Sequence, residues 1–327
     1  MKMLDDFPGI KEELELVGHT MREYVSDSLG RQPLSRIIEE IMASDGKHLR
    51  PALVLLFGRF GMTYPACRSK LVKTAAVVEL IHMASLIHDD IVDDAPSRRG
   101  RDTIQSAFGK DMAVYAGDYL LSCVLRELMS PEMLDIGQSL SRAMGDMCSG
   151  ELGQYAAQFN VNTDENQYFM NISGKTAALF SAACETGAIA SGCGQSSVSA
   201  SKQFGHSLGL IFQLRDDLLD CILSHEDSGK KQGMDFINGI YTLPVIYTFN
   251  DSHYGPAIRD LAARAKGMEP QQVFTELYSI VSVSGGVEYT RWIMRQYRER
   301  AMGYMLQLPS SPAKSQLSGV LDYLVEV

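Results

Sequence analysis

Residues 71–94 read LVKTAAVVELIHMASLIHDDIVDD, an apolar stretch that ends in four aspartates. Small and apolar side chains recur every three or four residues, and no proline interrupts them. This spacing is typical of an α-helix that is buried on most of its faces. The stretch therefore predicts a core helix over Leu71–Asp94, with Asp89, Asp90 and Asp93 near its carboxyl end.

The same periodicity recurs along the chain, and strand-like alternation bounded by turn residues is scarce. Loops are expected where glycine, proline and polar residues cluster, for example over Ala95–Asp102 and His225–Gly239. The sequence predicts an all-α protein of about ten or more helices, forming one domain over residues 1–327. The other long helices expected are Met112–Met129, Met133–Phe159, Tyr168–Ala190, Ser199–Leu223 and Val287–Leu306.

Composition and charge exclude several classes of protein. Of the 327 residues, 45% are apolar and 21% are charged, which is ordinary for a globular chain and unlike a disordered one. The formal net charge of −10 disfavours a nucleic-acid binder, because neutralising phosphates requires clustered basic residues. An anionic substrate remains open, since a bound metal ion reverses the sign of an acidic pocket.

Cysteine usage and hydropathy bear on the compartment. The six cysteines form no CxxC pair, and their spacing favours small core residues in a reducing cytosol over disulfides or a zinc site. The acidic N-terminus has no signal-like apolar region, and no run reaches the roughly 18 apolar residues of a membrane span. We expect a cytoplasmic protein without a transmembrane segment.

A second aspartate cluster repeats the first. Residues 213–220 read QLRDDLLD and follow an apolar run, as the first cluster does. Residues four apart lie one helical turn apart, so Asp89 pairs with Asp93, and Asp216 with Asp220, at about 6 Å. Like charges at this spacing destabilise a helix unless a cation compensates them, and Mg²⁺ prefers carboxylate oxygens shared with phosphates. The alternative to a metal site is a solvated acidic helix end. That alternative is reasonable for one such cluster but is disfavoured when the same pattern occurs twice.

Basic residues follow or precede both clusters. Residues 97–101 read SRRGR, residues 46–50 read GKHLR, and Lys175 stands in an otherwise apolar helix. Arginine presents a planar fork to phosphate oxygens, so these residues suggest a diphosphate clamp. The alternative to phosphate binding by Lys175 is a lysine whose ammonium group reaches the surface. The alternative to a binding role for His88 is a core histidine with its hydrogen bonds satisfied.

These motifs resemble those of the trans-isoprenyl diphosphate synthases, also called the polyprenyl synthetase family. The resemblance covers about residues 30 to 325, and the paired aspartate motifs are its most specific part. The matching stretches are Gly46–Pro51, Glu79–Gly100, Ala116–Asp118, Lys175–Thr176, Gln213–Asp220, Thr242–Pro244 and Gly285–Tyr289.

The resemblance implies an isoprenoid synthase-type helical bundle with a deep central cavity. It implies that the two aspartate motifs face each other and hold about three Mg²⁺ ions around an allylic diphosphate. It also implies a homodimer or, in some members, a heteromer with a small partner subunit. The reaction implied is condensation of isopentenyl diphosphate with a dimethylallyl, geranyl, farnesyl or geranylgeranyl diphosphate primer.

Residue roles are likewise implied by the matching positions. Isopentenyl diphosphate would be bound by Lys47, Arg50, His82 and Arg99. The allylic diphosphate would be bound by Arg98, Lys175 and Lys230. Thr176 and Gln213 would line the allylic cation. The metal ligands implied are Asp89, Asp90, Asp93, Asp216, Asp217 and Asp220. The implied catalytic set consists of five of these aspartates, all but Asp220, together with Lys175, Thr176 and Gln213.

Product length follows from the helix of the first cluster. An isoprene unit is about as long as one helical turn of 5.4 Å, so the growing chain passes about one turn per unit. Ala84 and Ser85 lie about one turn before Asp89 and are small, whereas short-chain relatives commonly have an aromatic residue there. We expect a long product of about six to eight units. The tunnel floor would come from deeper residues, namely Val77, Ile81, Ser122, Cys123, Leu125 or Met129.

The sequence departs from the family pattern at two positions. Ile240 stands where a lysine often precedes Thr-Leu-Pro, and His48 replaces a frequent arginine. A class I terpene cyclase is disfavoured because its second metal motif mixes other residue types, and a non-catalytic partner because both motifs are intact. A geranylgeranyl or farnesyl diphosphate synthase, or the catalytic subunit of a heteromeric synthase, stays open.

Overall fold

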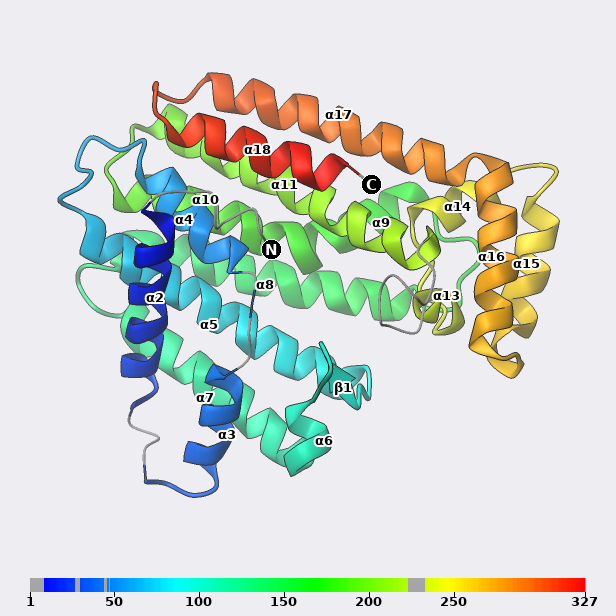
Figure 1. Ribbon diagram of the computed structural model, residues 1–327, viewed down its shortest axis with the longest axis horizontal. Helices are drawn as coiled ribbons and strands as arrows, with labels where there is room; N and C mark the ends of the chain where they lie inside the picture. The colour runs from blue at the N-terminus through cyan, green and yellow to red at the C-terminus, as the bar shows by residue number, and fades with distance from the viewer. Residues whose placement is uncertain (1–8, 27–29, 44–45, 47, 223–232, 327) are drawn as a thin grey trace. The chain divides into compact units, whose positions relative to one another are not determined.

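The computed structural model describes residues 9–26, 30–43, 46, 48–222 and 233–326 (Figure 1). Almost all of its regular structure is helical, so the predicted all-α class is confirmed. The elements in chain order are α2 (Ile10–Tyr24), α3 (Leu34–Met42), α4 (Leu49–Gly58), α5 (Arg68–Val92), β1 (Ser97–Arg98), β2 (Arg101–Asp102), α6 (Ile104–Phe108), α7 (Lys110–Leu128), α8 (Leu134–Ala156), α9 (Glu165–Ile172), η2 (Ser173–Ala177), α10 (Ala178–Ala190), α11 (Gln195–Ile222), α13 (Met234–Ile237), α14 (Leu243–Phe249), α15 (Gly255–Arg264), η3 (Ala265–Gly267), α16 (Pro270–Ser284), α17 (Gly286–Leu306) and α18 (Ala313–Val325).

The chain divides into two compact units. Unit 1 comprises Met1–Met144, Ala182–Lys202 and Gln307–Gln316. Unit 2 comprises Gly145–Ser181, Gln203–Leu306 and Leu317–Val327. The boundaries fall within α8, α10, α11 and α18 and at the end of α17. Each unit is described separately below, and the single domain expected from the sequence stays a prediction.

The core of unit 1 is built around α5. This helix contacts α7, α4 and α2, and Figure 1 shows α5 and α7 running side by side. Val77, Leu80 and Ala84 of α5 have no exposed surface. The helix is apolar on most faces because neighbours cover it on several sides, as the pattern of residues 71–94 predicted.

The hydropathy of α5 corrects one expectation from the sequence. By length and composition alone this 25-residue helix qualifies as a membrane span, with a mean hydropathy of 1.4 over an 18-residue window. The sequence prediction counted consecutive apolar residues and found no such window. Within the protein, 67% of that window is buried, as befits a core helix.

A short β-hairpin replaces the loop predicted over Ala95–Asp102. β1 pairs with β2 in antiparallel fashion, and Arg98 pairs with Arg101. The two turn residues, Arg99 and Gly100, have φ of +52° and +77°. Positive φ at both central positions is the geometry of a type I′ turn, which matches the twist of a hairpin. The strands are two residues long, which is too short to show alternation in the sequence.

A continuous helical run over α9, η2 and α10 corresponds to the helix predicted over Tyr168–Ala190. It begins at Glu165 because the Asp164 carboxylate accepts a hydrogen bond from the Gln167 N–H at 2.8 Å, which caps the first turn. Residues 173–177 form a π-helix, which periodicity did not predict. In unit 2 a Cβ at Gly150 of α8 would lie 2.1 Å from the Lys175 backbone nitrogen, so only glycine allows this close approach.

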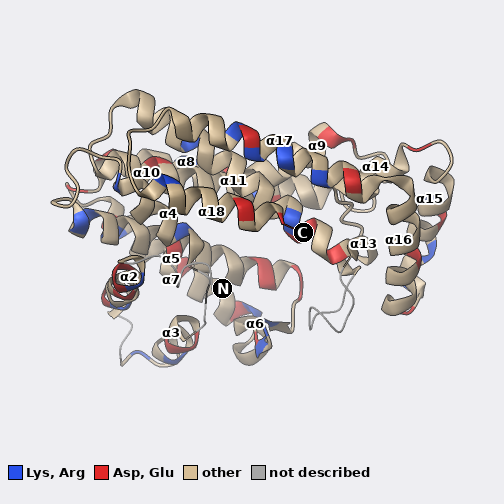
Figure 2. Ribbon diagram, turned by 45° about the horizontal axis from the view of Figure 1, so that its top comes forward, with Lys and Arg blue, Asp and Glu red and all other residues tan. Residues whose placement is uncertain are grey.

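The remaining helices of unit 2 pack as α14 with α17 and α15, and α15 with α16. The helix predicted over Val287–Leu306 is α17, displaced by one residue at its start. Figure 2 shows acidic and basic residues interspersed along the helices of both units. This is the expected pattern for helices that each bury one face and expose another.

Candidate active site

The first aspartate cluster lies at the end of α5 in unit 1. The Asp93 backbone N–H donates to the carbonyl oxygen of Asp89 at 2.8 Å, so the two residues are one helical turn apart, as their spacing predicted. Asp89 is half-buried, Asp93 is exposed and Asp90 is buried, with 6% of its surface exposed. The three carboxylates of the cluster therefore range from buried to exposed.

Arg98 of the hairpin binds the buried member of this cluster. Its Nε donates to Asp90 Oδ1 at 2.8 Å. Burial raises the pKa of Asp90, although the charge and hydrogen bond of Arg98 act against this. A carboxylate held this way needs positive charge near it, which Arg98 supplies here.

A neutral histidine surrounded by arginines forms a second feature of unit 1. Burial holds the pKa of His82 well below its usual value, and the positive charges of Arg50, Arg99 and Arg98 act in the same direction. His82 Nε2 lies 3.1 Å from Arg50 Nη1. A guanidinium only donates, so Nε2 accepts. The predicted binding residues Arg50, His82, Arg98 and Arg99 thus gather in unit 1, where their charge suits an anion.

An ion pair ties the segment before α4 to α5. His48 Nδ1 lies 3.0 Å from Glu79 Oε1, and the Glu79 side chain is 6% exposed. His48 has a left-handed φ of +43° and immediately precedes Leu49, the first residue of α4. Glu79 lies three residues before His82 on the same helix. The pair therefore fixes the segment that carries Arg50 against α5.

Three further positions singled out from the sequence are Lys47, Lys230 and Ile240. Lys47 and Lys230 lie outside the described residues. Ile240 is half-buried, and its backbone N–H donates to the carbonyl oxygen of Asp235 at 2.8 Å. An apolar side chain therefore stands where the family pattern often has a cation.

The residues expected to govern product length lie on α5 and α7. Ala84 has no exposed surface, and the half-buried Ser85 donates from its Oγ to the His82 carbonyl oxygen at 2.8 Å. Val77, Ile81 and Cys123 are buried, but Leu125 and Met129 are 55% and 78% exposed. Leu125 and Met129 were candidates for a tunnel floor; both are exposed in this chain, and their role in a floor stays a prediction.

His88 packs against α7, but its side chain is 35% exposed, so it is not a core group. Its Nε2 lies 3.5 Å from Asp118 Oδ1. A Cβ at Gly117 would lie 2.3 Å from the same nitrogen, so the glycine makes room for the imidazole. Ala116–Asp118 therefore serves to seat α7 beside the first aspartate cluster.

The second aspartate cluster lies on α11 in unit 2. Asp217 is buried, with 4% of its surface exposed, whereas Asp220 is half-buried and Asp216 is exposed. Burial raises the pKa of Asp217 to about 7, and the charges of Asp235 and Asp216 add to it. Burial, followed by the charges of Asp235 and Asp217, likewise raises the pKa of Asp220 to about 7.

A chain of hydrogen bonds ends on Asp217. Thr176 Oγ1 donates to Gln213 Oε1 at 2.6 Å, and Gln213 Nε2 donates to Asp217 Oδ1 at 2.6 Å. On the other side, the buried Tyr168 hydroxyl donates to Asp217 Oδ2 at 2.5 Å. The structure thus brings together three residues of the predicted set and adds Tyr168, which the sequence analysis did not select.

Lys175 stands in the π-helical turn η2. Its Nζ lies 3.0 Å from Glu151 Oε2 of α8, and the lysine side chain is 24% exposed. π-helical turns often occur at functional sites because they re-aim the side chains of a helix. The partly exposed ammonium group fits neither a buried core lysine nor a freely solvated one.

The carboxylates fit a divalent cation by their chemistry. Asp217 and Asp220 are oxygen donors that repel one another, and carboxylate oxygens are ligands that Mg²⁺ prefers. Among the described residues, no three acidic, histidine or cysteine side chains are grouped to hold a metal by themselves. A cation here would share its coordination with substrate phosphates, as Mg²⁺ does.

Comparison with known proteins decides the family. The sequence profile of the polyprenyl synthetase family matches residues 31–281. The chain belongs to the polyprenyl synthetase family. It is 33% identical over 323 residues to heptaprenyl diphosphate synthase component 2 of Geobacillus stearothermophilus, covering 98% of this chain and 95% of the relative.

Solved structures agree with this assignment to the polyprenyl synthetase family. A decaprenyl diphosphate synthase from Rhodobacter capsulatus superimposes with a TM-score of 0.87 at 32% identity, covering 97% of this chain and 96% of that one. A polyprenyl synthase from Caulobacter crescentus CB15, complexed with calcium and isoprenyl diphosphate, gives a TM-score of 0.88 at 28% identity, covering 97% and 95%. The predicted isoprenoid synthase-type fold and the predicted class of enzyme, a prenyltransferase, are confirmed.

Sequence reasoning did not select four residues of this polyprenyl synthetase that bind or electrostatically affect residues of the motifs. They are Glu79, Glu151, Tyr168 and Asp235. Tyr168 and Glu79 had a usable signal, since each places a polar group within an apolar helical pattern and so needs a partner. Glu151 and Asp235 had none, because nothing local distinguishes them from surface acids.

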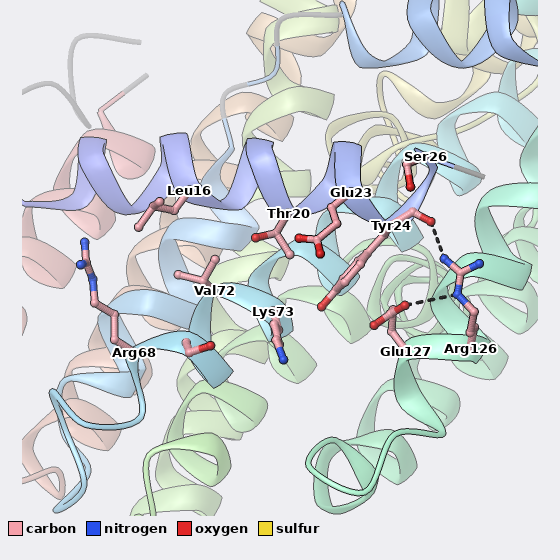
Figure 3. A pocket seen from close by; sticks show the side chains of 11 residues that line it. Leu16, Thr20, Glu23, Tyr24, Ser26, Arg68, Val72, Lys73, Arg126 and Glu127 are labelled. Atoms are coloured by element: carbon pink, nitrogen blue, oxygen red, sulfur yellow. Dashed lines mark hydrogen bonds and ion pairs between the residues drawn. The ribbon is translucent and has the colours of Figure 1, made fainter. Parts of the chain in front are cut away.

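A cavity of about 700 Å³ lies at the other end of α5 in unit 1 (Figure 3). About 30 Å of helix separate Ser69 at this cavity from Asp89. Arg126 of its wall donates to the Tyr24 carbonyl oxygen at 2.5 Å and pairs with Glu127. None of the predicted site residues lines it. The lining residues are Leu16, Thr20, Glu23, Tyr24, Ser26, Arg68, Ser69, Val72, Lys73, Arg126 and Glu127.

Proposed function

We propose that this chain condenses isopentenyl diphosphate with an allylic prenyl diphosphate, head to tail and in the trans sense, and releases diphosphate. The observation that carries the proposal is the pair of aspartate clusters, on α5 and α11, each with a buried carboxylate of raised pKa. The similarity to synthases named for heptaprenyl and decaprenyl diphosphate supports a long-chain product.

The two clusters would hold the metal ions of the reaction. The ligands proposed are Asp89, Asp90, Asp93, Asp216, Asp217 and Asp220. Bound Mg²⁺, about three ions in all, would neutralise the charge that develops on the departing diphosphate. The calcium and isoprenyl diphosphate bound by the Caulobacter relative are consistent with this donor set.

Cationic side chains would bind the two diphosphates. Arg50, Arg99 and the neutral His82 form an anion site in unit 1 that suits isopentenyl diphosphate, to which we assign Lys47 as well. For the allylic diphosphate we assign Arg98, Lys175 and Lys230. Lys175 would exchange or share its contact with Glu151 when the phosphate binds.

The carbon–carbon bond would form without a protein nucleophile. The C–O bond of the allylic diphosphate breaks, and the π electrons of isopentenyl diphosphate attack the resulting allylic carbon. The released diphosphate would then take the proton lost from the adjacent carbon. The oxygen dipoles of Thr176 and Gln213, held by their hydrogen bond to each other, would stabilise the positive charge.

We propose a product of about six to eight isoprene units, because Ala84 and Ser85 leave no bulky side chain one turn from Asp89. Farnesyl or geranylgeranyl diphosphate is the alternative product. The primer is one of the dimethylallyl, geranyl, farnesyl or geranylgeranyl diphosphates. The cytoplasmic location expected from the sequence stays a prediction.

A homodimer is the assembly we propose, with a small partner subunit as the alternative. The outer face of α7 supports an interface, since Tyr115, Leu125 and Met129 are 67%, 55% and 78% exposed. Large apolar side chains grouped on one helix face mark surfaces that bind protein. The word "component" in the name of the Geobacillus relative supports the alternative.

A product assay tests the proposal. The purified chain is incubated with Mg²⁺, isopentenyl diphosphate and farnesyl diphosphate, and the dephosphorylated products are sized by chromatography. A ladder ending at 30 carbons or more supports a long-chain synthase, and a stop at 15 to 20 carbons refutes the predicted length. Absence of condensation points to a missing subunit or to Ile240, and the variant Ile240→Lys separates the two.

A further inference from the structure

We propose that Tyr168 is a positioning residue that orients Asp217 for metal binding. The proposal rests on the proposed function, in which Asp217 belongs to a Mg²⁺-binding cluster. Tyr168 lies on α9, and Asp217 lies on α11, 49 residues further along the chain. Both residues and the bond between them belong to unit 2.

The contact is short and shielded from water. The Tyr168 hydroxyl donates to Asp217 Oδ2 at 2.5 Å, and the two residues are 5% and 4% exposed. The Tyr168 ring is held edge-on against Phe169, with centroids 5.3 Å apart at 73°. The phenol therefore has one defined position from which to donate.

The two oxygens of Asp217 are each held by a different donor. Tyr168 binds Oδ2, while Gln213 Nε2 binds Oδ1 at 2.6 Å. Two donors on opposite oxygens fix the plane of the carboxylate. Each oxygen has a further lone pair, so the carboxylate remains able to coordinate a cation. Donors around a ligand commonly set its orientation in this way.

The environment makes this support necessary. Asp217 is 4% exposed, so its oxygens depend on protein donors rather than on water. Without the phenol, Oδ2 would lose its partner in a site that water does not reach. The carboxylate would then turn away from the orientation that its two donors set, and this change weakens metal binding.

The experiment compares Tyr168→Phe with Tyr289→Phe in the full-length chain. Tyr289 is a matched control, because its hydroxyl also donates to a carboxylate in unit 2, Glu165 Oε2 at 2.9 Å, outside both clusters. Mn²⁺ binding in the presence of inorganic diphosphate is measured by electron paramagnetic resonance. Tyr168→Phe is expected to weaken Mn²⁺ binding about 10- to 100-fold, and Tyr289→Phe to change it less than about twofold.

Steady-state rates give a second measurement. The Mg²⁺ concentration for half-maximal rate should rise by the same factor in Tyr168→Phe, saturating Mg²⁺ should restore kcat to within about threefold, and KM for isopentenyl diphosphate should stay unchanged. Unchanged Mn²⁺ affinity, or a loss of kcat that saturating Mg²⁺ does not restore, overturns the inference. If Asp216→Asn leaves wild-type Mn²⁺ binding intact, the proposed metal site itself fails and the inference falls with it.

Discussion

Replacing Ser85 by phenylalanine is expected to shorten the product from about six to eight isoprene units to about two or three. Ser85 is half-buried on α5 and lies four residues before Asp89, which is about 6 Å along the helix axis. The native serine has a small side chain, which leaves space beside this turn of the helix. A phenyl ring would stop a prenyl chain that grows alongside α5 after about one further turn.

The length of α5 sets the magnitude. From Arg68 to Asp89 the helix extends about 32 Å, which corresponds to about six isoprene units of roughly 5 Å each. A chain that follows the whole helix therefore reaches 30 carbons or more. A chain blocked one turn, about 6 Å, from Asp89 has room for the unit that carries the diphosphate and for one or two more, giving about 10 to 15 carbons.

The assay sizes dephosphorylated products of the wild type, Ser85→Phe and the control Ser85→Ala. The control keeps a small side chain and should keep the long product. Circular dichroism and thermal unfolding establish that Ser85→Phe is folded. A folded Ser85→Phe enzyme that still makes products of 30 carbons or more would refute the path along α5.

Three further predictions concern charge and packing. Because burial raises the pKa of Asp217 to about 7 from an ordinary 3.8, the folded metal-free protein binds a proton more readily than the unfolded chain, and its stability falls as pH rises through 7. Calorimetry with a chelator should show at least about 1.4 kcal/mol more stability at pH 6 than at pH 8, or at least about 2 °C in Tm, because Asp220, with its pKa also raised to about 7, adds in the same direction. The absence of any gain would contradict the burial of these acids. Glu79→Gln removes the charge that holds His48 and should raise KM for isopentenyl diphosphate about threefold or more, leaving KM for the allylic substrate unchanged in steady-state kinetics. Gly150→Ala should cost at least about 2 kcal/mol in urea unfolding, since its Cβ would lie 2.1 Å from a backbone nitrogen of η2. The control Gly145→Ala, with nothing within 4 Å of its Cβ in the same helix, should instead stabilise the protein by up to about 1 kcal/mol.

Helices with a long, regular apolar pattern could be predicted from the sequence. The predicted Leu71–Asp94 and Met112–Met129 correspond to α5 and α7 within three residues at each end. Helical periodicity is a local property, since each side chain is compared only with those three and four positions away. The one-turn pairing of Asp89 with Asp93 could be predicted for the same reason.

Shorter or distorted elements could not be predicted in this way. The hairpin that carries Arg98 has strands of two residues, which hold no readable alternation. The π-helical turn η2 adds a residue to one turn of an otherwise α-helical run, and the apolar pattern around Lys175 does not register it. Leu125 and Met129 were named as possible floor residues because they follow Asp118 on the next helix, and both are exposed in this chain.

The sequence by itself determined the all-α class, the two aspartate clusters and the acidic chemistry that calls for a cation. These follow from residue types and from spacings of three or four positions, which the helix geometry alone converts into neighbours. The tertiary structure decided which groups support the clusters: Arg98 on Asp90, Tyr168 and Gln213 on Asp217, and Glu79 on His48. Tyr168 and Asp217 are 49 positions apart, and only burial of α9 and α11 in one core brings the phenol to the carboxylate and excludes the water that would otherwise replace it.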